Sequence, residues 1–207
     1  MAWRQWLDAL LGRPRLVPAR PEKLFALVTA APTLEQELGW VSTGRAGICL
    51  KPVATLQYAE VQQELVELAR LGARETKSRV EAVRDQLGFT WLVLEDPQFE
   101  DLVTLAHLAV STLEEKGFGT QVLSAVFRFQ PGSRLHEMAA ETLPSRIYLI
   151  YNYKRGTFYP FLPRGAQAQA ADGRLESAEL QAAALLGREL PVEKDPSRWY
   201  ALWECPV

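Results

Sequence analysis

The stretch SRVEAVRDQLGFTWLVL, residues 78–94, decides the fold class of this 207-residue chain. Residues 78–84 and 89–94 are typical of two strands joined by the turn Asp85-Gln86-Leu87-Gly88, in which Gly88 supplies a left-handed backbone. Both alternate sets of side chains in residues 89–94 are apolar, so this strand is expected to be covered on both faces and to lie centrally in its sheet. The stretch therefore predicts an antiparallel hairpin.

The residues that follow predict a helix, a strand and a second hairpin. An apolar stripe over residues 98–116 indicates a helix that begins after Asp96-Pro97 and ends at Gly117-Phe118-Gly119. Residues 121–129 are expected to form a strand. Residues 147–153 and 157–162 form a hairpin through Lys154-Arg155-Gly156. Pro160 cannot donate to a strand ladder, so the last of these strands is expected at a sheet edge.

The rest of the chain supplies helices and two further strands. Helices are predicted over residues 21–30, over a segment that Thr33 caps and Gly39 ends, over about 56–74 and over 175–186. Strands are predicted over residues 46–51 and 199–204. Antiparallel hairpins alternating with helices indicate the α+β class, with an antiparallel sheet and helices packed on one face. We expect an appendage at residues 1–23, which we call the head, and a single α+β domain at residues 24–207.

The net charge of −2 conceals an uneven distribution. Residues 1–23 carry a net charge of +3, and the other 184 residues carry −5. A basic appendage on an acidic body suggests an anionic partner for the appendage, or arginines that only solvate a linker. The overall balance argues against binding of nucleic acid through a basic surface. No apolar run is long enough for a membrane-spanning helix, and two cysteines do not make a disulfide framework.

The first twelve residues predict an amphipathic helix. Trp3, Trp6 and Leu10 share one side of the helical wheel, and Gly12 followed by prolines ends the pattern. The apolar side could dock on the chain's own domain, on a partner helix or on a membrane surface, and the sequence leaves these three open.

Motifs for catalysis or metal binding are absent from the sequence. The chain has two histidines and two cysteines, and no pair of them has the spacing of zinc ligands. His107 lies at the margin of an apolar helix stripe and is expected to be structural. No nucleophile motif or phosphate-binding loop is present. We therefore predict no catalytic residues, no metal and no cofactor.

Aromatic and basic residues gather near the C-terminal strands. This composition can build a core, but tyrosine, tryptophan and arginine are also enriched at binding hot spots. With the three apolar head residues, the candidates for partner binding are Trp3, Trp6, Leu10, Tyr153, Lys154, Arg155, Tyr159, Arg198 and Trp199. The predicted edge strand around Pro160 is a possible docking edge.

Six segments distributed along the chain resemble one known family. They are WLDALLGR, LFALVTAAPTLEQELG, SRVEAVRDQLGFTWLVLED, STLEEKGFG, IYLIYNYKRGTFYPFLP and LPVEKDPSRWYALWECP. In this combination and order the chain, from Trp6 to Pro206, resembles the PspA-associated PspAB family. The segment 135–143 is longer than the family pattern leads us to expect.

The resemblance implies a cytoplasmic bacterial protein of the phage-shock envelope-stress response, encoded with PspA-type membrane-binding coiled-coil proteins or HtpX-type membrane zinc proteases. The family supplies no catalytic residues. We expect a non-enzymatic adaptor or regulator, which could also contact the inner membrane peripherally. The alternatives are a secretion-chaperone-like module that holds a client segment on its sheet edge, and an enzyme or small-molecule binder with a pocket near His107, Arg198 or Tyr151.

Overall fold

The computed structural model describes residues 21–52, 63, 67, 78–133, 144, 146–164, 173–203 and 205–207. The predicted head helix with Trp3, Trp6 and Leu10 and the segment 135–143 lie outside these residues, and so does the predicted helix over about 56–74 except for residues 63 and 67, both of which are helical. In the described part of the chain, no helix is both long and apolar enough to cross a membrane.

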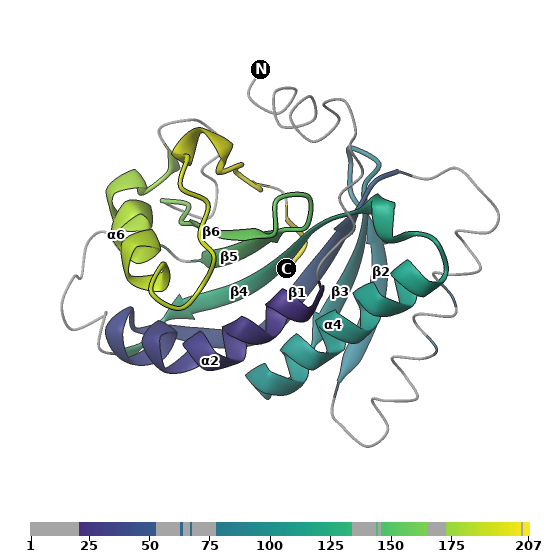
Figure 1. The fold of residues 1–207 in the computed structure, drawn as a ribbon, viewed down its shortest axis with the longest axis horizontal. Coiled ribbons are helices and arrows are strands. Elements are labelled where there is room, and N and C mark those ends of the chain that lie inside the picture. The colour runs from purple at the N-terminus through teal and green to yellow at the C-terminus, as the bar shows by residue number, and fades with distance from the viewer. Residues whose placement is uncertain are drawn as a thin grey trace.

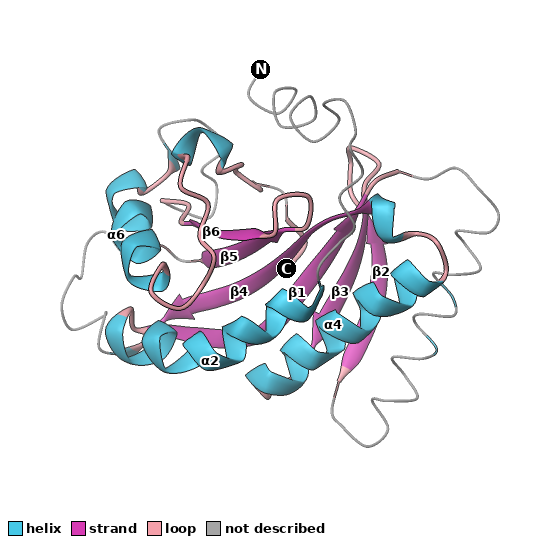
Figure 2. Ribbon diagram, in the orientation of Figure 1, coloured by secondary structure: helices cyan, strands magenta, loops and turns pink. Residues whose placement is uncertain are grey.

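Six antiparallel strands form one sheet (Figures 1 and 2). They are β1 (Trp40–Leu50), β2 (Arg79–Arg84), β3 (Thr90–Glu95), β4 (Val122–Pro131), β5 (Ile147–Asn152) and β6 (Thr157–Phe161). The order is β2-β3-β1-β4-β5-β6, so both predicted hairpins are present and β6 is an edge strand. β3 is an interior strand with apolar side chains on both faces, as its sequence predicted. The α+β class is confirmed.

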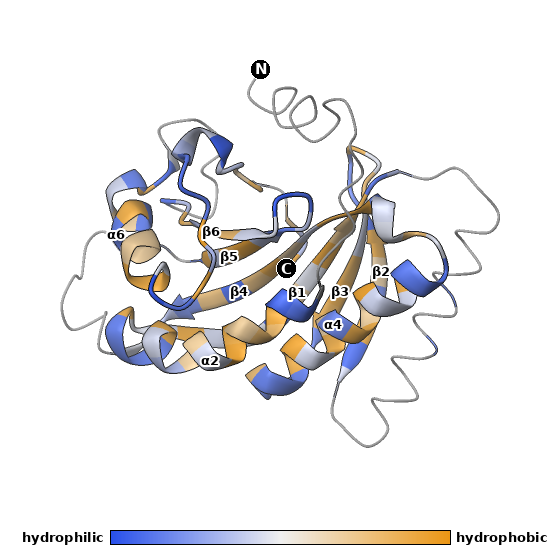
Figure 3. Ribbon diagram, viewed as in Figure 1, coloured by the Kyte–Doolittle hydropathy of each residue, from blue (hydrophilic) through white to orange (hydrophobic). Residues whose placement is uncertain are grey.

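Two helices cover one face of the sheet (Figure 1). They are α2 (Ala26–Pro32), which follows a 3₁₀ turn at Pro21–Phe25, and α4 (Phe99–Glu115). Figure 3 shows the hydrophobic residues of α4 alternating with hydrophilic ones along the helix. Because the Gly117 backbone is left-handed (φ 83°), the Phe118 N–H bonds back to the Leu113 carbonyl at 2.7 Å and ends α4 as predicted.

The opposite face of the sheet is covered by residues 199–203 and 205–207, which we call the C-terminal segment. Trp199, Leu202, Cys205 and Val207 pack there against the side chains of β1, β3 and β5. The helix α6 (Glu176–Leu186) lies beside β6 and contributes to both apolar clusters, through Leu186 on one side and Ala183 on the other.

The prediction that Thr33 begins a new helix is wrong. Thr33 has helical dihedral angles (φ −65°, ψ −42°), and α2 continues without a break into a wider π turn at Thr33–Glu37. The Leu38 N–H donates to the Thr33 carbonyl at 3.1 Å, which is the i→i+5 bond of a π turn, so the chain stays helical beyond Pro32. The Thr33 hydroxyl donates to the Glu189 carboxylate and does not cap the helix. Gly39 (φ 64°) ends the helix, as predicted.

The prediction of a final strand over residues 199–204 is also wrong. After a 3₁₀ turn at Pro196–Arg198, the described residues of this segment have no regular structure. The Trp199 N–H donates to the Pro196 carbonyl and the Trp199 carbonyl accepts from Arg174, so neither group is available for a strand ladder. The segment is apolar because its side chains pack against the sheet.

Candidate functional site

The aromatic side chains proposed for partner binding lie in the core. Tyr153, Tyr159 and Trp199 are 1%, 2% and 5% exposed. This agrees with the alternative interpretation, in which these residues build the core. Trp199 Nε1 donates to the Glu193 carbonyl at 3.0 Å, and the Tyr159 hydroxyl donates to the Tyr200 carbonyl at 3.3 Å. Tyr159 and Trp199 belong to the cluster that holds the C-terminal segment on the sheet, whereas Tyr153 packs in the cluster on the helix side. None of the three rings is open to a partner in this structure.

The basic candidates lie nearer the surface and bond to acidic neighbours. Arg155 pairs with Glu193, while Arg198 lies 3.0 Å from Asp195 and is about half exposed. Lys154 is half-buried. A partner-binding role for these three side chains stays a prediction.

The Arg155–Glu193 pair makes stability sensitive to acid. Burial raises the pKa of Glu193, but hydrogen bonds from Arg155 and from the Asp195 N–H outweigh it, so the net pKa is lowered. A carboxylate whose pKa is lower when folded stabilises the protein above its unfolded pKa, about 4.3, and this contribution is lost as the pH falls through the folded pKa.

We therefore expect the free energy of unfolding to fall less between pH 7 and pH 3 in Glu193→Gln than in the unsubstituted protein. The measurement is urea denaturation at each pH. The matched control is Glu35→Gln, since Glu35 is exposed. An unchanged pH dependence in Glu193→Gln would rule out the pair as its source.

The predicted docking edge at β6 is partly closed near the start of the strand. The register with β5 turns the backbone groups of Phe158, Pro160 and Leu162 away from the sheet. The Phe158 N–H donates to the Pro191 carbonyl, and its carbonyl accepts from the Glu193 N–H, both at 2.8 Å. Pro160 has no donor. The chain's own segment 191–193 thus occupies the position that a client strand would take.

The other end of the same edge is closed by α6 and the segment before it. The Leu162 N–H donates to the Glu179 carboxylate at 2.7 Å, and its carbonyl accepts from the Leu175 N–H at 3.0 Å. A chaperone-like use of this edge would require these bonds to break, which corrects the expectation of a docking edge around Pro160.

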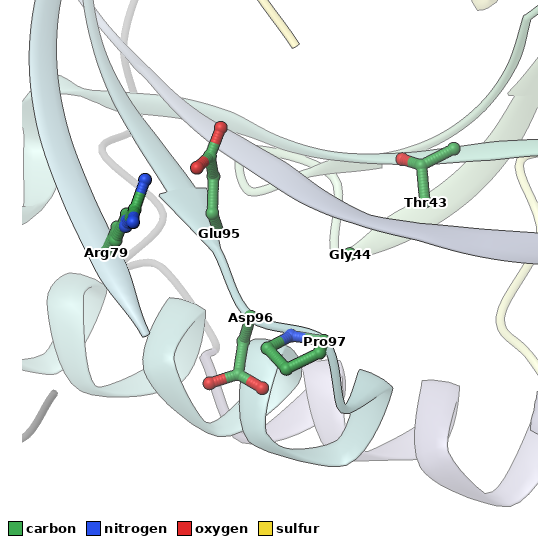
Figure 4. Close-up of a pocket in the computed structure, with 6 residues that line it drawn as sticks. All are labelled: Thr43, Gly44, Arg79, Glu95, Asp96 and Pro97. Atoms are coloured by element: carbon green, nitrogen blue, oxygen red, sulfur yellow. The ribbon is translucent and has the colours of Figure 1, made fainter. Parts of the chain in front are cut away.

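An open hollow of about 410 Å³ lies where β2 begins and β3 ends (Figure 4). It is lined by Thr43, Gly44, Arg79, Glu95, Asp96 and Pro97. In Figure 4 the Arg79 and Glu95 side chains stand on one side of their strands, whereas Asp96 points toward the helices. Asp96 is buried, and its carboxylate accepts from Ser78 and from the Gln98 N–H (2.8 Å) just before α4. Asp96 is therefore structural, and Arg79 and Glu95 supply the charge of the hollow.

Charged residues continue from this hollow across the sheet. Arg79 of β2, Glu95 of β3, Arg45 of β1 and Arg128 of β4 are successive cross-strand partners. We call these four residues the arginine row. Arg45 Nε lies 3.2 Å from Glu95 Oε1, and both side chains are more than one third exposed. The row places three arginines and one glutamate on four adjacent strands, in a chain whose net charge is negative.

Sequence reasoning missed this row because its members are distant in the chain. One local signal was available. Arg128 is the only charged residue in the apolar strand sequence VLSAVFRF, and charged residues are rare in buried strands. Register between strands, which brings Arg45 beside Arg128, has no signature in a single sequence.

The residues tested for chemistry in the sequence are structural where the structure describes them. His107 packs against the Phe25 ring, with centroids 4.7 Å apart. Cys49 and Cys205 are buried free thiols, and burial raises the pKa of Cys205 to about 12, which keeps it protonated and unreactive at neutral pH. In the described residues, no group of three or more histidine, cysteine or acidic side chains could hold a metal ion.

Comparison with known proteins agrees with the family resemblance. The family described as PspA associated protein B matches residues 4–207. No curated protein and no solved structure matches the chain. The match extends over nearly the whole chain, including the hollow, the arginine row and the C-terminal segment. This chain is a member of the PspA-associated protein B family.

Proposed function

We propose that this protein is a non-enzymatic adaptor or regulator that binds a PspA-like protein in the envelope-stress response. The observation that carries the proposal is the family match over residues 4–207, since the family is described by its association with PspA. We place the protein in the cytoplasm, where the basic head could contact the inner membrane surface peripherally. An HtpX-type membrane protease is a second possible partner, proposed from the family resemblance alone.

An exposed apolar patch on the helix layer supports binding to a helical partner. Phe25 in the 3₁₀ turn is 41% exposed, its ring packs on His107 of α4, and the next residue of α4, Leu108, is 49% exposed. Large exposed apolar side chains on neighbouring helical segments are typical of surfaces that receive the apolar stripe of another helix. We therefore assign the PspA-like partner to the Phe25–His107–Leu108 patch.

Substitution of the patch is expected to weaken binding at least tenfold. The measurement is the dissociation constant between the purified full chain and the PspA-like protein of the same genome. Leu108→Asp should raise this constant, because it places a carboxylate where apolar area would be buried. Leu180→Asp on α6 is the matched control, since Leu180 is equally exposed (50%) on another part of the molecule. If the two proteins do not bind, the adaptor proposal fails; if Leu180→Asp weakens binding as strongly, the patch assignment fails.

The head is tested separately. Replacing Trp3, Trp6 and Leu10 together with alanine should reduce recovery of the PspA-like protein or of inner-membrane vesicles in a pull-down. Intact recovery of both would remove the head from the proposal and leave the patch as the binding surface.

A further inference from the structure

The arginine row lies on the face of the sheet that the C-terminal segment covers. Side chains alternate along a strand, and Val93 and Val126, two residues from Glu95 and Arg128, belong to the apolar cluster on that face. The C-terminal segment reaches Gly47, where an added Cβ would meet Val207 at 2.9 Å. Gly47 is two residues from Arg45. The row therefore borders the apolar part of this face.

Two guanidinium donors in the row have no hydrogen-bond partner. Arg45 Nε and Arg128 Nε are both buried atoms without an acceptor. The Arg45 contact with Glu95 is an ion pair by distance but does not satisfy Nε as a hydrogen bond. Arg128 makes no ion pair with any described residue. Because buried donors in folded proteins are nearly always paired, two neighbouring unsatisfied donors indicate that an acceptor binds there.

A further arginine strengthens the positive charge nearby. Burial raises the pKa of Tyr148, the cross-strand partner of Arg128, and the charges of Arg146 and Arg128 partly offset that rise. Both arginines act on Cys205 in the same direction, against the effect of burial. Arg128 and Arg146 therefore lie close enough to act on the same groups at the end of the row.

We propose that Arg45 and Arg128, with Arg79 at the rim, bind a phosphate group. Glu95, which pairs with Arg45, is the one carboxylate in a row of three arginines, so a dianion balances the remaining charge better than a second carboxylate. Guanidinium forks also match phosphate oxygens in pairs. The open hollow lined by Arg79 and Glu95 adjoins the row and receives the rest of the ligand. The phosphate belongs either to a soluble small molecule or to a lipid headgroup.

The first test is isothermal titration calorimetry of the full chain with inorganic phosphate. A titration with potassium chloride of equal ionic strength is the control for ionic strength. We expect saturable binding, and we expect Arg128→Gln to weaken it at least tenfold. Arg188→Gln is the matched control, because Arg188 is 68% exposed and pairs at 3.6 Å with Glu37, which ends the π turn on the helix side. Thermal melts confirm folding, and if Arg128→Gln does not fold, Arg45→Gln takes its place.

The second test distinguishes the two sources of phosphate. Vesicles of phosphatidylcholine with and without phosphatidic acid are sedimented with the full chain carrying alanine at Trp3, Trp6 and Leu10, which removes the head's contribution. Cosedimentation that needs phosphatidic acid and is lost in Arg128→Gln assigns a lipid headgroup. Saturable phosphate binding without cosedimentation assigns a soluble ligand. The proposal is overturned if phosphate does not bind saturably, if acetate binds equally well, or if Arg188→Gln loses as much affinity as Arg128→Gln.

Discussion

Gly44→Ala is expected to lower the free energy of unfolding by about 3 kcal/mol, because a left-handed backbone and a close contact are both violated. Gly44 has φ 71° in a bulge of β1, where the register with β4 shifts between Ser42 and Arg45. A Cβ at this position would lie 2.7 Å from the Asp96 carbonyl oxygen. The Asp96 N–H donates to the Gly44 carbonyl at 2.9 Å, so the two backbones are held together and cannot separate without losing that bond.

The measurement is urea denaturation, and the melting temperature should fall by roughly 6–12 °C. Gly117→Ala is the matched control. Gly117 also has a positive φ (83°), but an added Cβ there meets nothing within 4 Å. It should therefore cost only the backbone strain, about 1 kcal/mol. Equal losses in the two variants would show that the close approach to Asp96 does not matter.

Glu179→Ala is expected to lower the free energy of unfolding by about 4 kcal/mol, because it leaves a buried charge unpaired. The Glu179 side chain accepts from Arg174 Nη2 at 2.7 Å and from the Leu162 N–H at 2.7 Å. Burial raises the pKa of Glu179, and the bonds from Arg174 offset only part of that rise. Without the carboxylate, the Arg174 guanidinium, 15% exposed beside the Phe161 ring, loses its counterion, and the Leu162 N–H loses its acceptor.

Three variants separate these causes in urea denaturation. Glu176→Ala, an exposed acidic residue of the same helix turn, is the control and should change stability by less than about 0.5 kcal/mol. The double variant Arg174→Met, Glu179→Leu removes both charges and should be more stable than Glu179→Ala. If it is no more stable, the unpaired Arg174 charge is not the cause of the loss.

Local patterns predicted most of the elements. The two hairpins depend on Gly88 and Gly156, each of which has a positive φ at its turn. The helix α4 was recognised by its apolar stripe and by its stop at Gly117. Two predictions failed where tertiary contacts replaced a local preference: Thr33 bonds to Glu189 instead of capping a helix, and the apolar segment 199–204 packs on the sheet without joining it.

The candidate site was predicted less well, for a related reason. Tyr153, Tyr159 and Trp199 have the composition of a binding surface, but composition does not say which rings are buried, and all three lie in the core. Trp3, Trp6 and Leu10 lie outside the described residues, and their role stays a prediction.

By itself the sequence determined the α+β class, the strand boundaries of both hairpins, the edge position of β6 and the family. These depend on residues close together in the chain, where glycine, proline and apolar periodicity act directly on the backbone. Only the tertiary structure decided that the β6 edge is closed by segment 191–193 and α6, and that Arg79, Arg45 and Arg128 stand in one row. Strand order and register bring Arg45 beside Arg128, 83 positions away, and no local preference encodes which strands become neighbours.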